Sequence, residues 1–200
     1  MSREEVVDPA MVEQNEDWVS YLKFIEKIRN PLVKSFVEGF VKTKVPDYFA
    51  RIPASASGKY HPEFSQGYGG LLRHTMAVAT LVHDISELEY LQLKSTEKDL
   101  LFAAALLHDT FKQGVEEVGT TLRTHPNIAA QEIAKFGKEI GQEKMGNIIA
   151  RLVISHMGQW GNQKPGNREQ FLVHVADFIA SRKYLDIEYD KLVKPDVEKQ

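Results

Sequence analysis

The sequence predicts an all-α protein. Apolar residues recur at intervals of three and four positions along most of the 200-residue chain, which is the period of one face of a helix. No segment shows the alternation of apolar and polar residues that is typical of strands. Prolines and small polar residues stand where several of these segments would begin. We therefore expect a bundle of amphipathic helices around one core.

The composition is that of an ordinary globular domain. Apolar residues make up 42% and charged residues 26% of the chain, and no apolar stretch approaches the ~18 residues of a membrane span. The chain contains no cysteine, so any metal site must use histidine nitrogens and carboxylate oxygens. The net charge of −3 does not favour an extensive non-specific nucleic-acid surface. The N-terminus shows no signal pattern, and we expect a cytoplasmic protein without membrane contact.

The first two helices are predicted at about 15–29 and from Pro31 to the Val45-Pro46 pair. The first follows an acidic start and has apolar residues at Trp18, Leu22, Ile25 and Ile28. Pro31 fits the first turn of the second helix, and the residue before Pro46 is biased away from helix. The segment 51–70 then contains two prolines and several glycines. Loops of this length inside a compact domain are often functional.

Five further helices are predicted in the rest of the chain. They run from about 71 to 91, from a cap at Ser95 or Thr96 to the His108-Asp109 pair, from Pro126 to near Gly137, from about 142 to 157, and from about 169 to 183. A polar loop at 158–167 separates the last two.

The most informative feature is the His108-Asp109 pair, which follows the apolar run 100–107. Consecutive helix positions differ by about 100° in direction, so the two side chains converge on one ion only where the helix ends. Further candidate ligands lie near other predicted helix ends or on a helix, namely His74, His125, His156 and Asp177. Imidazole and carboxylate ligands suit Mn, Fe, Ni, Co or Zn, and a carboxylate-rich set also admits Mg. Such ions support hydrolysis.

Other readings of the histidines stay open at this point. A histidine at a helix end is often only a cap or a partner of the helix dipole. His83 has no ligand-like surroundings and is expected to be structural. His174 lies on the same helix face as Asp177, where it would either orient a ligand or belong to the core.

This pattern resembles the HD superfamily of metal-dependent phosphohydrolases. The likeness covers about residues 58–183 and is carried by five elements in order, which are Gly69-Gly70-Leu71-Leu72-Arg73-His74-Thr75, Ala105-Leu106-Leu107-His108-Asp109, His125, Ile154-Ser155-His156 and Val175-Ala176-Asp177. It is most similar to the HD domain of bacterial 3′→5′ exoribonucleases that join an OB-fold to an HD domain. The resemblance implies an HD-domain helical bundle at 58–185, preceded by an N-terminal helical extension packed on the core (1–57) and followed by a charged tail (186–200).

The resemblance also implies roles for individual residues. His74, His108, Asp109 and Asp177 match the ligands of a first metal, and Asp109 would bridge to a second one held by His125 and His156. One or two divalent ions are expected, without a choice among Mn, Fe, Ni, Co, Zn and Mg. Asp109 and Lys112 are the candidate catalytic residues. Phe111 stands where many members have glycine.

Cations interleaved with aromatic residues near these positions suggest a substrate with a phosphate and a base. The candidates are Lys59, Tyr60, His61, Arg73 and Trp160. We expect hydrolysis of a phosphate ester through a metal-bound hydroxide, in a small nucleotide or at the end of a short single-stranded oligonucleotide. A di-iron oxygenase of the same fold and a non-catalytic nucleotide-binding protein are the alternatives.

Overall fold

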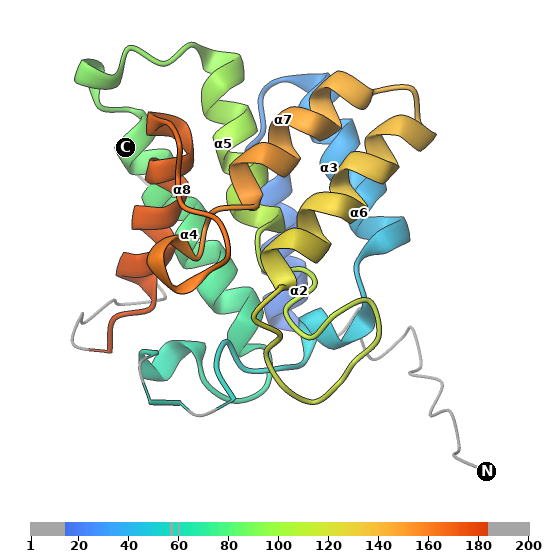
Figure 1. The fold of residues 1–200 in the computed structure, drawn as a ribbon, viewed down its shortest axis with the longest axis vertical. Coiled ribbons are helices and arrows are strands. Elements are labelled where there is room, and N and C mark those ends of the chain that lie inside the picture. The colour runs from blue at the N-terminus through green and yellow to red at the C-terminus, as the bar shows by residue number, and fades with distance from the viewer. Residues whose placement is uncertain (1–14, 57, 60, 184–200) are drawn as a thin grey trace, which may run out of the picture.

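A computed structural model describes residues 15–56, 58–59 and 61–183 of the chain. Within these residues all regular structure is helical and no strand occurs, which confirms the all-α prediction (Figure 1). None of the described helices is long and apolar enough to cross a membrane. The first 14 residues and the predicted tail at 186–200 lie outside the described part.

Seven α-helices and four short 3-10 helices make up the described chain. The α-helices are α2 (Glu16–Ile25), α3 (Pro31–Lys44), α4 (Gly70–Ser86), α5 (Ser95–Leu107), α6 (His125–Glu139), α7 (Glu143–Val153) and α8 (Arg168–Ala180). The 3-10 helices are η1 (Asp47–Ala50), η2 (Glu63–Ser65), η3 (Glu89–Leu91) and η4 (Gly158–Trp160).

Asparagine side chains begin three of the helices. The Asn30 side chain accepts hydrogen bonds from the backbone N–H groups of Leu32 and Val33, and Pro31 occupies the first turn of α3. Asn15 and Asn167 cap α2 and α8 in the same way. These bonds satisfy donors that a helix N-terminus leaves without partners.

The predicted cap of α5 is wrong in position. The helix begins at Ser95, so Lys94 occupies the cap position that the sequence assigned to Ser95 or Thr96. The Glu97 carboxylate accepts the Lys94 backbone N–H at 2.7 Å. A glutamate in the first turn therefore does part of what a capping hydroxyl would do, and its charge favours the helix N-terminus.

One continuous hydrophobic core joins all seven helices. Helix α4 packs on α5 and α8, α5 packs on α7, and α6 pairs with α7. In Figure 1, α4, α5 and α8 lie on one side of the molecule, and α3, α6 and α7 lie on the other. Helices α2 and α3 contact α4, α5 and α6, so the described part of the predicted N-terminal extension shares this core. The predicted domain boundaries themselves stay a prediction.

Two contacts fix the chain segments that lead into the polar centre. The Tyr21 hydroxyl donates to the Leu106 carbonyl at 2.9 Å, which ties α2 to the last turn of α5. At the start of α4, Gly70 lies so close to the backbone of Ser65 and Pro53 that a side chain would overlap them. The loop before α4 is thereby packed directly against the first turn of α4, which precedes the turn that carries His74.

Two glycines let α6 and α7 approach closely. A Cβ atom added at Gly137 would lie 2.9 Å from the Gly146 Cα and 3.1 Å from the Gln142 carbonyl oxygen. Both neighbours are backbone atoms, which cannot rotate away as a flexible side chain can. The α6–α7 pair must therefore separate to accept any larger residue at this crossing.

We expect Gly137→Ala to destabilise the protein by about 1–3 kcal/mol because the helices must move apart. This loss exceeds the ~1 kcal/mol that alanine gains over glycine in a helix. Thermal unfolding should show a Tm lower by roughly 2–10 °C. Asn147→Ala, at an exposed position of α7, is the matched control and should leave Tm nearly unchanged; an unchanged Tm for Gly137→Ala would contradict the close approach.

Candidate metal centre

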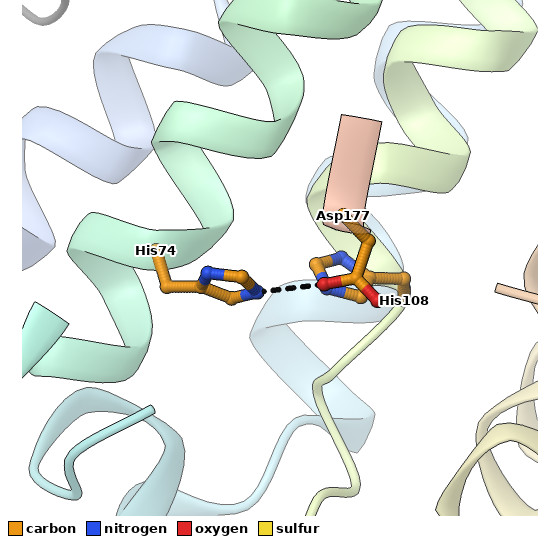
Figure 2. Close-up of side chains that lie close together, drawn as sticks. All are labelled: His74, His108 and Asp177. Carbon is orange, nitrogen blue, oxygen red and sulfur yellow. Dashed lines mark hydrogen bonds and ion pairs between the residues drawn. The ribbon is translucent and has the colours of Figure 1, made fainter. Parts of the chain in front are cut away.

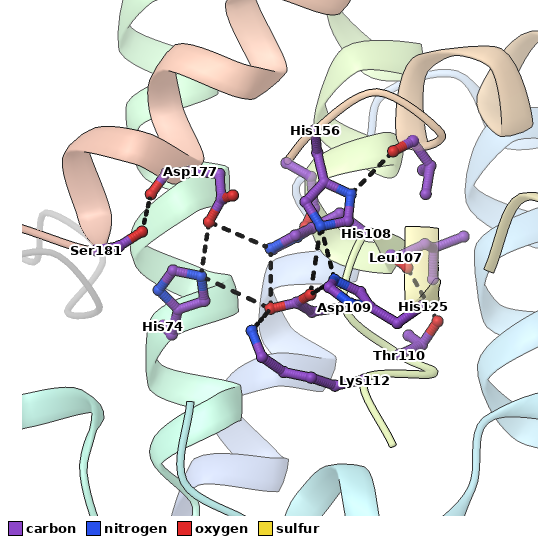
Figure 3. A network of polar contacts seen from close by, with 12 residues as sticks. His74, Leu107, His108, Asp109, Thr110, Lys112, His125, His156, Asp177 and Ser181 are labelled. Carbon is purple, nitrogen blue, oxygen red and sulfur yellow. Dashed lines mark hydrogen bonds and ion pairs between the residues drawn. The ribbon is translucent and has the colours of Figure 1, made fainter. Parts of the chain in front are cut away.

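The six metal-ligand candidates meet at one place between the helices (Figure 3). His74 comes from the second turn of α4, Asp177 from α8, and His125 is the first residue of α6. His108 and Asp109 directly follow α5, and His156 lies three residues beyond α7. The four histidines are fully buried, Asp109 is 1% exposed, and the Asp177 side chain keeps 13% exposure. Residues distant in sequence thus form a single buried polar centre.

A first group of ligand atoms comprises His74 Nε2, His108 Nε2 and Asp177 Oδ1 (Figure 2). Asp177 Oδ1 lies 3.0 Å from His74 Nε2 and 3.9 Å from His108 Nε2. Asp109 Oδ2 adds a further oxygen, 3.4 Å from His108 Nε2 and 3.8 Å from His74 Nε2. Two imidazoles and two carboxylates therefore surround one small volume.

A second group lies on the other side of the Asp109 carboxylate. Asp109 Oδ1 is 2.9 Å from His125 Nε2 and 3.5 Å from His156 Nε2. The two histidine Nε2 atoms are themselves 2.9 Å apart. The Asp109 carboxylate thus directs one oxygen to each group, which is the placement of a bridging ligand.

Backbone carbonyls fix the orientation of three of the imidazoles. The Nδ1–H groups of His108, His125 and His156 donate to the carbonyls of Ala105, Leu122 and Val153, at 2.7, 2.6 and 2.9 Å. A carbonyl oxygen can only accept, so the proton of each neutral ring is on Nδ1 and the Nε2 lone pair faces the centre. Metal-binding histidines are held by such outer hydrogen bonds. His74 differs, because its Nδ1 has no partner among the described residues.

This donor set fits a divalent cation. In these tautomers the lone pairs of His125 and His156 face each other and the Asp109 oxygen in a buried space. His108 Nε2 likewise has no hydrogen-bond partner in the described part of the chain. Buried acceptors that face one another are costly unless a proton or a cation lies among them. Nitrogen and oxygen ligands of this kind are those that Mn, Fe, Co, Ni and Zn accept.

The electrostatics of the centre favour positive charge. Burial alone would lower the pKa of His108, but the Asp109 and Asp177 carboxylates outweigh burial and raise it. Burial opposes ionisation of Asp109 and Asp177 as well. The Lys112 ammonium and His108 nevertheless hold the pKa of Asp109 below the usual range, and the His74 hydrogen bond, together with the nearby imidazoles, does the same for the pKa of Asp177. Two buried carboxylates thus remain ionised and attract cations.

Lys112 reaches this centre although Phe111 replaces the glycine of the resembled family. Its ammonium group pairs with Asp109 Oδ2, and the residue is only 7% exposed. The Lys112 backbone N–H donates to the Asp109 carbonyl at 3.0 Å, which closes a turn. Phe111 points into the core and packs edge-on against Phe40, with ring centres 6.2 Å apart. The turn therefore accommodates the larger residue and still directs the lysine inward.

The predicted substrate-binding residues differ in how close they lie to the metal centre and in how exposed they are. His61 lies against the centre, with its ring 5.3 Å from the His74 ring. Lys59 is exposed on the same loop, and Tyr60 lies outside the described residues. Trp160 is in η4 and is 43% exposed.

Arg73 is engaged by the loop that precedes α4. Its guanidinium group donates to the carbonyls of Phe64, Gln66 and Tyr68, and it pairs with Asp17 of α2. These bonds use donors from all three guanidinium nitrogens. The arrangement favours a role in holding the loop over the predicted role in binding substrate.

Sequence reasoning left His174 undecided and did not single out Phe178 and Arg182. His174 Nδ1 donates to the His156 carbonyl at 2.7 Å and so holds the backbone of a ligand residue. Gly158, at φ +53°, lies against the His174 ring, and a side chain there would overlap it. Residues 174, 178 and 182 are spaced by four positions, which places them on one side of the α8 segment. That spacing was the available signal.

The comparisons with known proteins agree with this geometry. A model of the HD domain matches residues 71–181, more than half of the chain. The chain is 27% identical to the 3′-5′ exoribonuclease YhaM of Bacillus velezensis over 98% of its own length and 63% of that protein. It is 30% identical to the YhaM of Shouchella clausii over 80% of its length and 51% of that protein. It is 26% identical to the YhaM of Bacillus subtilis over 90% of its own length and 58% of that protein.

The chain therefore spans between half and two thirds of the length of these curated relatives. No solved structure is matched significantly.

We expect the protein to bind divalent ions at this centre, with metal content measured by elemental analysis after reconstitution. Saturating ion should raise Tm by roughly 5–10 °C, because binding at 100 times the Kd contributes about 2.7 kcal/mol. Asp109→Ala should abolish binding and His156→Ala should lower the metal content. His83→Ala, at an exposed position of α4, should keep the full content; a wild-type content in Asp109→Ala would disprove the site.

The metal-free protein should lose stability as the pH falls from about 6.5 to 4. Burial lowers the pKa of His61 to about 3 and of His156 to about 4, and nearby positive groups add to this. The unfolded chain binds these protons near pH 6.5, so acid favours unfolding by about 1.4 kcal/mol per pH unit for each proton. Denaturant unfolding of chelated protein measures this slope. His61→Gln should make the dependence of the unfolding free energy on pH less steep. Equal slopes for the variant and the wild type would contradict the lowered pKa of His61.

Proposed function

Because the chain belongs to the HD domain family, we propose that it is a metal-dependent phosphohydrolase that removes nucleotides from the 3′ end of single-stranded RNA. The observation that carries the hydrolytic part is the Asp109 carboxylate, which directs one oxygen to each of two groups of ligand atoms. Two adjacent ions can together hold the attacking and the leaving oxygen of a phosphoryl transfer. The choice of RNA rests on the relatives, which are named 3′-5′ exoribonucleases.

We assign His74, His108, Asp109 and Asp177 to one ion, and Asp109, His125 and His156 to the other. When bound, such ions lower the pKa of a coordinated water toward ~7 and offset the charge of the phosphate. The protein holds the imidazoles in position through the carbonyls of Ala105, Leu122 and Val153. Little reorganisation is then needed when substrate arrives.

Lys112 supplies a fixed positive charge beside the reacting phosphate. Its ammonium group lies next to Asp109 Oδ2 and is almost fully buried. A buried cation acts on a phosphate oxygen in surroundings of low dielectric constant, where charge stabilisation is strong. We therefore propose that Lys112 binds a non-bridging phosphate oxygen of the scissile group.

The proposed reaction is hydrolysis of the last phosphodiester. A water oxygen forms a bond to phosphorus, the bond to the 3′ oxygen of the preceding nucleotide breaks, and one proton passes from water to that oxygen. The products are a nucleoside 5′-monophosphate and an RNA shortened by one residue. The di-iron oxygenase and the non-catalytic nucleotide-binding alternatives have no support in the matched relatives. A cytoplasmic location is part of the proposal.

We expect the purified chain with Mn²⁺ to shorten 5′-labelled single-stranded RNA one nucleotide at a time. Lys112→Met should lower kcat by about 10²–10³-fold, the usual cost of removing one group that stabilises transition-state charge. Asp109→Ala should abolish activity, and His83→Ala should retain it. Product lengths on a denaturing gel and the identity of the released mononucleotide provide the measurement.

A circular RNA of the same sequence separates this proposal from internal cleavage, since it has no 3′ end. Rapid cutting of the circle would rule out action from the end. A panel of cyclic dinucleotides and nucleotide monophosphates, assayed in parallel, tests the small-nucleotide substrates. If the Asp109→Ala protein still hydrolysed RNA in the presence of a chelator, the metal centre would have no role in the reaction.

A further inference from the structure

A cavity of about 470 Å³ opens directly beside the metal centre. Its walls include His61, Trp160, His174, Asp177, Phe178 and Arg182. Asp177 belongs to both places, because Oδ1 faces His74 while the side chain keeps 13% exposure. Its volume is in the ~300–1,000 Å³ range of small-molecule pockets. A group bound in this cavity would therefore lie next to a phosphate held at the metal centre.

One wall of the cavity is an aromatic surface. The rings of Trp160 and Phe178 are parallel to within 5°, with centres 5.5 Å apart. Trp160 keeps 43% exposure, which is a large exposed area for an indole whose only role is to pack on the domain. Flat, partly exposed aromatic rings stack nucleobases without strong preference for sequence.

Arg182 adds a cation to the same wall. Its guanidinium carbon lies 4.3 Å from the Phe178 ring centre and 5.9 Å from that of Trp160. Arg182 Nε donates to the Phe178 carbonyl at 3.1 Å, which fixes the group in place. Within the described residues its terminal nitrogens have no hydrogen-bond partner. A stacked guanidinium of this kind adds to the aromatic rings a further planar surface, which carries a positive charge.

The wall is also linked to the ligand residues. The centre of the His174 ring lies 6.2 Å from the ring centre of Trp160 and 6.4 Å from that of Phe178. Its Nδ1 donates a hydrogen bond to the His156 carbonyl. A base on this surface is therefore held in a fixed position relative to the second group of ligands.

We propose that this cavity binds the 3′-terminal nucleoside of the RNA, with its base stacked on the surface of Trp160, Phe178 and Arg182. The proposal rests on the proposed function, because it takes the phosphate at the metal centre to be the scissile one. The stacked base belongs to the nucleotide that leaves.

The first test compares two short RNAs that differ only in the terminal residue, one ending in adenosine and the other in an abasic ribose. Stacking should make the KM for the adenosine end lower by about 5- to 100-fold. Trp160→Ala should raise that KM to the abasic value without changing the abasic KM, and Trp160→Phe should keep most of the difference. Arg182→Ala should raise the KM by about 2- to 10-fold. Tyr90→Ala, at a residue 93% exposed in η3, is the control for loss of an aromatic ring.

The second test needs no turnover. In a Trp18→Phe background Trp160 is the single tryptophan, and 5′-AMP should quench its fluorescence in a saturable way. Quenching without RNA hydrolysis would support the cavity and overturn the proposed function. Hydrolysis with equal KM for the two RNAs would overturn the cavity and leave the function standing. A Trp160→Ala protein with lower Tm but wild-type KM would show that the aromatic surface is only structural.

Discussion

Two carboxylates buried among imidazoles are the constraint on which the rest of the structure depends. Asp109 is almost fully buried and pairs with Lys112, and Asp177, whose side chain is 13% exposed, lies within hydrogen-bond distance of His74. Charge without compensation in such a place costs several kcal/mol. The centre meets this cost with Lys112 and with histidines whose lone pairs face inward, so it is arranged around positive charge. Four of its ligands stand at or just beyond helix ends, and His74 and Asp177 reach it from within α4 and α8.

Helix ends supply both the position and the orientation of two of the ligands, His108 and His156. The last carbonyls of a helix have no partner within it. Here the carbonyls of Ala105 and Val153, in the last turns of α5 and α7, accept the Nδ1–H groups of His108 and His156. The same bonds satisfy the backbone and orient the rings. A histidine three residues after such a carbonyl is therefore well placed to bind a metal ion. This is the physical reason why His108 and His156 stand just beyond helix ends.

Much of the fold and of the centre follows from local patterns, whereas contacts between distant segments do not. Prolines and apolar spacing indicate the helices, and the His108-Asp109 pair indicates where one of them ends. The start of α5 does not follow from a capping hydroxyl, because the Glu97 carboxylate takes that place. Arg73 lies beside a ligand in sequence, yet only the folded loop shows that its donors are engaged. The stacking of Trp160 on Phe178 depends on the approach of η4 to α8, which no local pattern encodes.

The contact of Gly158 with the His174 ring extends the influence of the centre beyond its ligands. Any side chain at position 158 would displace the imidazole that holds the backbone of His156. During divergence from a common ancestor, the two positions are thus expected to be exchanged as a pair. A lineage that acquires a larger residue at 158 would need a smaller partner at 174 and another anchor for His156. Covariation between these two sites in an alignment would be the trace of that history.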